Sequence, residues 1–180
     1  MPRFLRLAAL AIAALAATGC AAALTVSAHK DPTVDFTKYR TYEWAVRDAL
    51  PANDPRLSDN PDFKDRLEGA VERQMAARGF EKAGSAPDLL VHYHASTSNR
   101  IDVNRIDSDY GYCYEDDCRV RVMEYEAGTV VIDMVDARTN RLVWRGWARG
   151  ALDDMLDPDS MARRLNDAVA RMLTLLPPAL

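Results

Sequence analysis

The sequence predicts an α+β fold in which a mostly antiparallel sheet packs two helices on one face, as a two-layer sandwich. Three observations lead to this prediction. Stretches of alternating or β-branched residues outnumber helical ones, turn-forming residues join most of them, and two amphipathic stretches have helical spacing. Each helix must bury an apolar stripe, and one shared sheet face is the simplest way to cover both stripes.

The first elements are two short strands near the N-terminus. Residues 24–28 alternate between apolar and polar, and Asp31-Pro32 ends this strand. Residues 41–46 are rich in aromatic and β-branched types and predict the second strand. Residues 50–61 contain three prolines and several Asp and Asn residues, which predicts an exposed connection.

A helix is expected to follow this connection. Asn60 suits the N-cap, Pro61 the first helical position, and Asp62 the positive end of the helix dipole. Gly79 suits a left-handed C-terminal cap. The apolar residues at helical spacing are Phe63, Leu67, Ala70, Val71 and Met75.

The second half of the chain is mostly strand. Residues 89–95 predict a strand by residue type, and the polar residues 97–119 predict a loop or ragged hairpin. Residues 120–125 and 129–135 are β-forming, and the turn at 136–140 predicts an antiparallel partner at 141–148. The chain is therefore expected to add four or five strands after the first helix.

A second helix is expected at the C-terminal end. Asp157-Pro158-Asp159 repeats the cap-and-proline start, and Pro177-Pro178 stops the helix. Its apolar stripe comprises Met161, Leu165, Ala168, Val169, Met172 and Leu176. We expect this stripe to dock on the sheet.

The N-terminus has the layout of a secretory signal: a basic start, an apolar run at residues 7–17, and small residues before Cys20. The run is shorter than the roughly 20 residues that a membrane-spanning helix needs. Thr18-Gly19-Cys20 resembles the lipobox of bacterial lipoproteins, although Ala17 stands where Leu is usual. This resemblance implies a signal peptide at 1–19, cleavage before Cys20 and acylation of that cysteine by membrane lipid.

The alternative is ordinary cleavage nearby, which would leave a soluble periplasmic protein. The residue after Cys20 is Ala21, not the Asp that is typical of inner-membrane retention, so the resemblance implies a lipid anchor on the periplasmic face of the outer membrane. Residues 20–180 then form a single α+β domain after a short tether at about 20–23.

The charge argues against one class of partner. The chain carries a formal charge of −4, and loss of Arg3 and Arg6 with the signal would lower it by two, to −6. Nucleic-acid binding requires a clustered basic patch, and the Lys and Arg residues here are scattered. We therefore expect no nucleic-acid partner, and no cofactor is expected.

Cys113 and Cys118 remain as a pair once Cys20 is acylated. In an oxidising compartment, a local disulfide is the default interpretation of such a pair. The alternative is a metal site that uses both thiolates, although zinc ribbons normally bring a second pair of ligands.

His92 and His94 are the candidate metal ligands. Their i, i+2 spacing on a strand places both rings on one face of the sheet, and Asp133 on a nearby strand could complete a site. An open, polar sheet face with two histidines is the simpler interpretation. Ser96 and Ser98 lie near His94, but no nucleophile elbow of the Gly-x-Ser-x-Gly kind surrounds them, so no catalytic residue is assigned.

Trp147 and Arg145 are the candidate partner-binding residues, together with Tyr112 and Tyr114 in the predicted loop. Trp144 and Trp147 have opposite parity on one strand, so at most one of them is expected in the core. An exposed tryptophan beside an arginine suits stacking on a ligand, since both types are enriched at binding hot spots. The alternative is a tryptophan that protects the sheet edge.

Several stretches together resemble the bacterial lipoprotein family called domain of unknown function 4136. They are Asp35-Phe36 with Tyr39, Thr41-Tyr42 and Trp44, then residues 87–91 with Tyr93, and finally residues 128–133 and 142–146. They span most of residues 24–176. The acidic, cysteine-containing loop at 107–119 departs from the pattern. The family has no established activity, so the resemblance implies location and fold and leaves function open.

The leading hypothesis is a non-enzymatic lipoprotein of the cell envelope that binds or scaffolds another envelope protein or a glycan. The sheet face or the 97–119 loop would provide its contact surface. The alternative is a periplasmic metal-binding protein or hydrolase that uses His92, His94 and Asp133.

Overall fold

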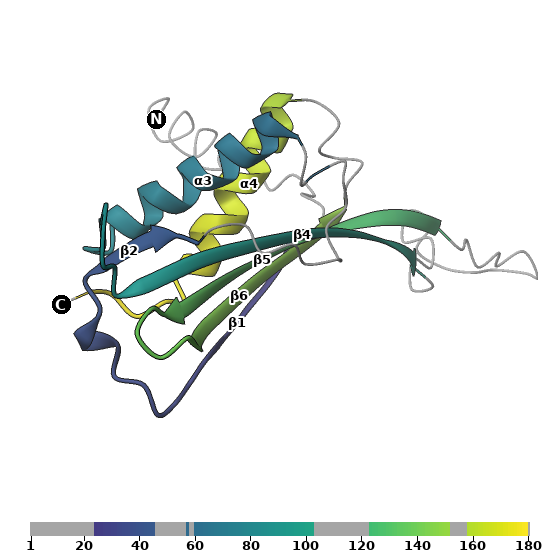
Figure 1. Cartoon of the computed structure of the whole chain (residues 1–180). Helices are drawn as coiled ribbons and strands as arrows, with labels where there is room; N and C mark the ends of the chain where they lie inside the picture. The colour runs from purple at the N-terminus through teal and green to yellow at the C-terminus, as the bar shows by residue number, and fades with distance from the viewer. Residues whose placement is uncertain (1–23, 46–56, 58–59, 103–122, 152–157, 180) are drawn as a thin grey trace, which may run out of the picture.

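The computed structural model describes residues 24–45, 57, 60–102, 123–151 and 158–179, which form one sheet and two long helices (Figure 1). In chain order the elements are β1 (Thr25–Lys30), the 3-10 helix η1 (Phe36–Lys38), β2 (Thr41–Trp44), α3 (Pro61–Ala76), β3 (Glu81–Lys82), β4 (Leu89–Asp102), β5 (Met123–Asp136), β6 (Arg141–Ala151) and α4 (Pro158–Leu173).

The sheet is mixed, which corrects the prediction of a mostly antiparallel one. Its strand order is β1-β6-β5-β4-β2-β3. β1, β6, β5 and β4 pair antiparallel, but β2 pairs parallel with both β4 and β3. The helix α3 lies between β2 and β4 in the chain, and parallel neighbours require a crossover of this length. The α+β class is confirmed.

β4 and β5 are longer than predicted. Each has 14 residues, and they remain paired from Leu89↔Asp136 to Asp102↔Met123. Of the two alternatives for residues 97–119, a loop or a ragged hairpin, the hairpin is confirmed for residues 97–102, because they continue β4 and pair with β5. The predicted strands at 120–125 and 129–135 are also not separate, since β5 is continuous from Met123. Figure 1 shows this hairpin extending beyond the rest of the sheet.

The caps of α3 match the sequence signals. The Asn60 side chain accepts a hydrogen bond from the Phe63 N–H, Pro61 opens the helix and Asp62 lies in its first turn. Gly79 adopts a φ of 85°, the left-handed conformation that the sequence predicts after the helix. α4 begins at Pro158 as expected but ends at Leu173, before the predicted Leu176.

The core lies between the helices and one face of the sheet. Figure 1 shows α3 and α4 side by side on the same side of the sheet. Leu89, Val91, Ile132 and Met134 alternate along β4 and β5 and are at most 1% exposed. The apolar stripes of both helices are also buried against this face. Burial of these side chains stabilises the folded state by roughly 25 cal/mol for each Å² of apolar area removed from water.

Trp144 fills the core face of β6 by lying over a glycine. Its side chain is 1% exposed. A Cβ built on Gly146 would lie 2.3 Å from the Trp144 Cη2 atom, so the indole occupies the space that a larger residue would need. Trp144 and Gly146 are two residues apart and therefore share one face of the strand. The stretch 142–146 thus contains a tryptophan and the glycine that accommodates it.

Several predicted features lie outside the described residues. They are the signal peptide at 1–19, Cys20, most of the connection at 50–61, Tyr112, Cys113, Tyr114, Cys118 and the Asp157 cap. Within the described part of the chain, no helix combines the length and apolar character that a membrane crossing requires.

Candidate functional site

The sheet face opposite the helices carries five of the predicted site residues; no helix among the described residues covers it, and we call it the open face. The strand registers place Trp147 and Arg145 of β6 opposite Val131 and Asp133 of β5. The same registers bring Ser27 and His29 of β1, Arg149 of β6, Thr129 of β5 and His92 and His94 of β4 onto this face. The structure therefore brings His92, His94, Asp133, Arg145 and Trp147 together.

Asp133 is the buried centre of this face. It is 5% exposed and accepts two 2.6 Å hydrogen bonds from the Nε and Nη2 atoms of Arg145. These hydrogen bonds, together with the attraction of the carboxylate, raise the pKa of Arg145 above its ordinary value. Such a bidentate pair fixes both side chains across neighbouring strands.

The geometry favours an ion-pair role for Asp133 over the predicted metal role. His94 Nε2 lies 3.7 Å from Asp133 Oδ2, and His92 is its cross-strand neighbour. Both oxygens of the carboxylate already bind the guanidinium of Arg145, which a cation would have to displace. Among the described residues, no group of three or more His, Cys, Asp or Glu side chains gathers closely enough to hold a metal ion.

The two tryptophans of β6 face opposite ways, as their parity predicts. Trp144 is buried in the core, whereas Trp147 is half-buried on the open face opposite Val131 and Ser27. Arg149 lies two residues further along the same face, where its Nε donates a 3.3 Å hydrogen bond to Thr129 Oγ1. The open face therefore offers an aromatic surface next to a guanidinium.

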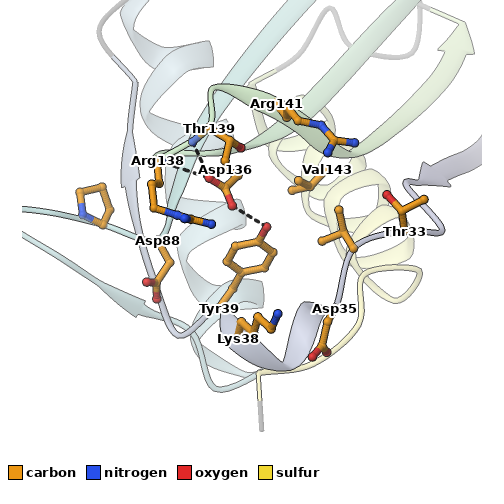
Figure 2. Close-up of a pocket in the computed structure, with 12 residues that line it drawn as sticks. Thr33, Asp35, Lys38, Tyr39, Asp88, Asp136, Arg138, Thr139, Arg141 and Val143 are labelled. Atoms are coloured by element: carbon orange, nitrogen blue, oxygen red, sulfur yellow. Dashed lines mark hydrogen bonds between the residues drawn. The ribbon is translucent and has the colours of Figure 1, made fainter.

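A pocket of about 570 Å³ lies at one end of the sheet (Figure 2). Three segments far apart in the sequence form it: residues 33–39 after β1, Pro87-Asp88 before β4, and residues 136–143 at the β5–β6 turn. Tyr39 connects two of these segments, because its hydroxyl donates a 2.9 Å hydrogen bond to Asp136 Oδ2. The sequence analysis assigned no ligand site here.

The carboxylates at this pocket hold the chain together. One oxygen of Asp88 accepts hydrogen bonds from Arg40 N, Thr41 N and Thr41 Oγ1, at 2.8, 2.9 and 3.0 Å. Partial burial raises the pKa of Asp88, but these hydrogen bonds outweigh it and leave the pKa below its ordinary value. Asp88 thus anchors the start of β2 beside the start of β4.

Asp136, like Asp88, accepts hydrogen bonds from other parts of the chain. Its Oδ1 atom accepts hydrogen bonds from the N–H groups of Arg138 and Thr139, and its Oδ2 atom accepts one from Tyr39. Burial opposes the ionised form of Asp136, yet the hydrogen bonds lower its pKa. For Tyr39, burial first and the bond to Asp136 second raise the pKa to about 12, so this phenol remains protonated at neutral pH.

Some of the residues that carry the family resemblance line this pocket. Asp35, Tyr39, Pro87 and Asp88 all line the pocket, and all belong to the stretches that resemble the family. Their separation in the sequence hid the fact that they meet. Tyr39 and Asp136 are 97 residues apart, and only the sheet topology brings them into contact.

The described residues define a class of protein by their fold: an α+β fold with a mixed sheet, whose two long helices lie on one face. The family model for domain of unknown function 4136 matches residues 26–178. The chain therefore belongs to the family of domain of unknown function 4136. Comparison with curated proteins finds no match.

Two solved structures share the fold at low sequence identity, and a third is similar at a lower score. A PDZ domain protein from Parabacteroides distasonis has 15% identity and a TM-score of 0.54, and the match covers 93% of this chain and 39% of that one. This chain thus spans about two fifths of that protein's length. A family member from Bacteroides thetaiotaomicron has 14% identity and a TM-score of 0.50, with 84% and 94% covered. PelC from Paraburkholderia phytofirmans, solved as a dodecamer, has 14% identity and a TM-score of 0.49, with 88% and 100% covered.

Proposed function

We propose that this protein is a lipoprotein, anchored through Cys20 on the periplasmic face of the outer membrane, that binds another envelope protein through its open face. The observation that carries the proposal is the composition of that face. Trp147 and Arg149 lie beside each other there, and the central carboxylate, Asp133, is already neutralised by Arg145.

The charge of this face favours an acidic partner surface. Arg149, His29, His92 and His94 lie around the balanced Asp133–Arg145 pair. The chain as a whole is acidic, so the guanidinium of Arg149 beside this balanced pair is a local positive charge that an acidic partner surface could meet. Complementary charge of this kind speeds association and fixes the orientation of two partners, while a half-buried tryptophan supplies contact area.

The position of the tether agrees with this role. β1 starts at Thr25, five residues after Cys20, and runs along the sheet edge beside β6. A lipid on Cys20 would hold the domain next to the bilayer through a tether of about four residues. The domain would then act as a membrane-bound docking module.

The anchor itself gives the first prediction. Replacing Cys20 with serine removes the thiol that the acyl chains require, so the protein should be lost from the outer-membrane fraction of the cell. Separation of outer membrane, inner membrane and soluble fractions followed by immunoblotting measures this loss. Cys113→Ser is the matched control and should remain in the outer-membrane fraction; a Cys20→Ser protein that stays in the outer membrane would contradict lipid anchoring.

The second prediction tests the open face by site-specific photocrosslinking in living cells. A photoreactive residue at Ser96, which lies on this face opposite Thr129, should form a discrete adduct with one protein. A second change, Arg149→Glu, should reduce the adduct at least fivefold, because it repels an acidic partner surface. The matched change Lys64→Glu on α3 should leave the yield unchanged.

Three results would overturn the protein-docking proposal. One is an equal yield of the same adduct when the photoreactive residue replaces Arg163 on α4, which lies on the other side of the sheet (Figure 1). Another is an adduct that Arg149→Glu does not weaken. The third is an adduct that a muramidase releases and a protease does not, since it would assign the face to cell-wall glycan.

A further inference from the structure

We infer that the pocket in Figure 2 binds a small organic anion, with its carboxylate or phosphate group between Lys38 and Arg138 and its apolar body against Tyr39 and Val143. This site is separate from the open face, and the inference does not depend on the function proposed for that face.

The volume suits a small molecule. Ligand pockets in proteins commonly have volumes of about 300–1,000 Å³, and this pocket has about 570 Å³. Its wall includes the ring of Tyr39, which is 8% exposed, and the side chains of Val34 and Val143. These groups give the pocket an apolar side against which a carbon skeleton can pack.

The cations at the pocket are available to a ligand. Within the described residues, neither Lys38 nor Arg138 makes a side-chain hydrogen bond or a salt bridge. Figure 2 shows their side chains on either side of the Tyr39 ring. Arg141, the third cation of the lining, already pairs with Asp31 through a 2.7 Å contact. An anion between Lys38 and Arg138 would therefore meet two positive groups without a hydrogen-bond partner, of which Lys38 is also attracted by the carboxylate of Asp35.

The carboxylates at the pocket, in contrast, are committed to the protein. Asp88 and Asp136 together accept hydrogen bonds from Arg40, Thr41, Arg138, Thr139 and Tyr39. Asp35 accepts two from Thr37, through its backbone N–H and its hydroxyl. Both oxygens of Asp136 and one oxygen each of Asp35 and Asp88 therefore accept hydrogen bonds from the chain itself. The side-chain donors left for a ligand belong to Lys38 and Arg138, which favours an anion as the ligand.

The same interactions make the site preorganised. The Tyr39–Asp136 bond joins the segment after β1 to the β5–β6 turn, and the N–H of Ala137 donates a 2.9 Å bond to the carbonyl of Asp88. All three walls of the pocket are thus tied to one another without a ligand. A preformed site loses less conformational entropy when it binds a ligand, so even a small anion with few contacts can bind with measurable affinity.

The test is a ligand-observed saturation-transfer NMR titration of the full-length chain in a non-ionic detergent. The probes are phenyl phosphate, benzoate and benzyl alcohol, which share an aromatic body and differ in charge. We expect saturable binding of at least one anion and none of the neutral alcohol. Binding of phenyl phosphate alone would identify a phosphoryl ligand, benzoate alone a carboxylate, and both a site that recognises charge.

The variant Lys38→Ala/Arg138→Ala should weaken anion binding at least tenfold. Both side chains are exposed and unpaired, so the variant should melt at the wild-type temperature by circular dichroism. The matched control is Lys64→Ala/Arg163→Ala, which removes two exposed cations from the helices and should bind as the wild type does. Binding that survives in the first variant, or is lost equally in the control, overturns the inference, as does the failure of both anions to bind.

Discussion

Replacement of Gly146 with alanine is expected to lower the free energy of unfolding by about 3 kcal/mol, because overpacking a filled core forces side chains out of their rotamers. The added Cβ would lie 2.3 Å from one atom of the Trp144 ring and 2.9 Å from another. The indole is 1% exposed and is surrounded by the core, so it has little room to move. Urea denaturation followed by tryptophan fluorescence measures the change.

Gly84→Ala is the matched control for this prediction. No heavy atom lies within 4 Å of a Cβ built on Gly84, and this glycine lies in the exposed segment before β4. Its replacement should change the stability by no more than about 0.5 kcal/mol. If Gly146→Ala proved as mild as Gly84→Ala, the close packing of Trp144 over the glycine would be wrong.

Replacement of Arg145 with glutamine is expected to cost about 2 kcal/mol, because it leaves a buried carboxylate without its charged partner. Asp133 is 5% exposed, and both of its oxygens accept hydrogen bonds from Arg145. Among the described residues, His94 lies 3.7 Å from Asp133, and His92 is its cross-strand neighbour. Since the Arg145 side chain is itself 47% exposed, solvent should reduce the cost from that of a fully buried pair.

A double-mutant cycle separates this interaction from other effects. Asp133→Asn in the Arg145→Gln background removes the unpaired charge, so the double variant should be more stable than Arg145→Gln alone. Arg149→Gln is the control on the same strand and face, because Arg149 makes only a long hydrogen bond to Thr129 within the described residues. Equal losses for Arg145→Gln and Arg149→Gln would contradict a structural role for the Asp133–Arg145 pair.

The sequence predicts the local features of the fold well. The cap at Asn60, the proline at Pro61 and the left-handed Gly79 involve residues close in the chain, and each is confirmed. The parity of Trp144 and Trp147 is confirmed for the same reason, since strand periodicity assigns neighbouring residues to opposite faces. Local rules are sufficient wherever the partners are neighbours in the sequence.

The features that the sequence did not predict depend on pairing between distant segments. The parallel contact of β2 with β4 follows from the crossover through α3, and residue types in β2 do not encode it. The mostly polar residues 97–102 resemble a loop, and no helix among the described residues covers that end of the hairpin, yet their backbone pairs with β5. Register and topology, which composition does not report, decide both cases.

The same limit applies to the candidate site. Residue types and strand spacing predict that Asp133 lies with His92 and His94, and the structure does place all three on one face. The register after the turn at 136–140, with its irregularity between Met134 and Val135, decides that Arg145 faces Asp133. A single shift in that register would place Asp133 opposite a different side chain.

The pairing of β1 with β6 has a consequence for the order in which the chain can fold. Thr25 and Arg149 are partners near opposite ends of the domain, so the first strand to be synthesised must wait for the last one. Contacts between residues so far apart in the sequence form slowly, because the chain loses the entropy of the long intervening loop before the contact stabilises it. Until β6 emerges, the chain lacks the partner that completes this edge of the sheet. β1 is therefore one of the last strands of the sheet that can pair during synthesis.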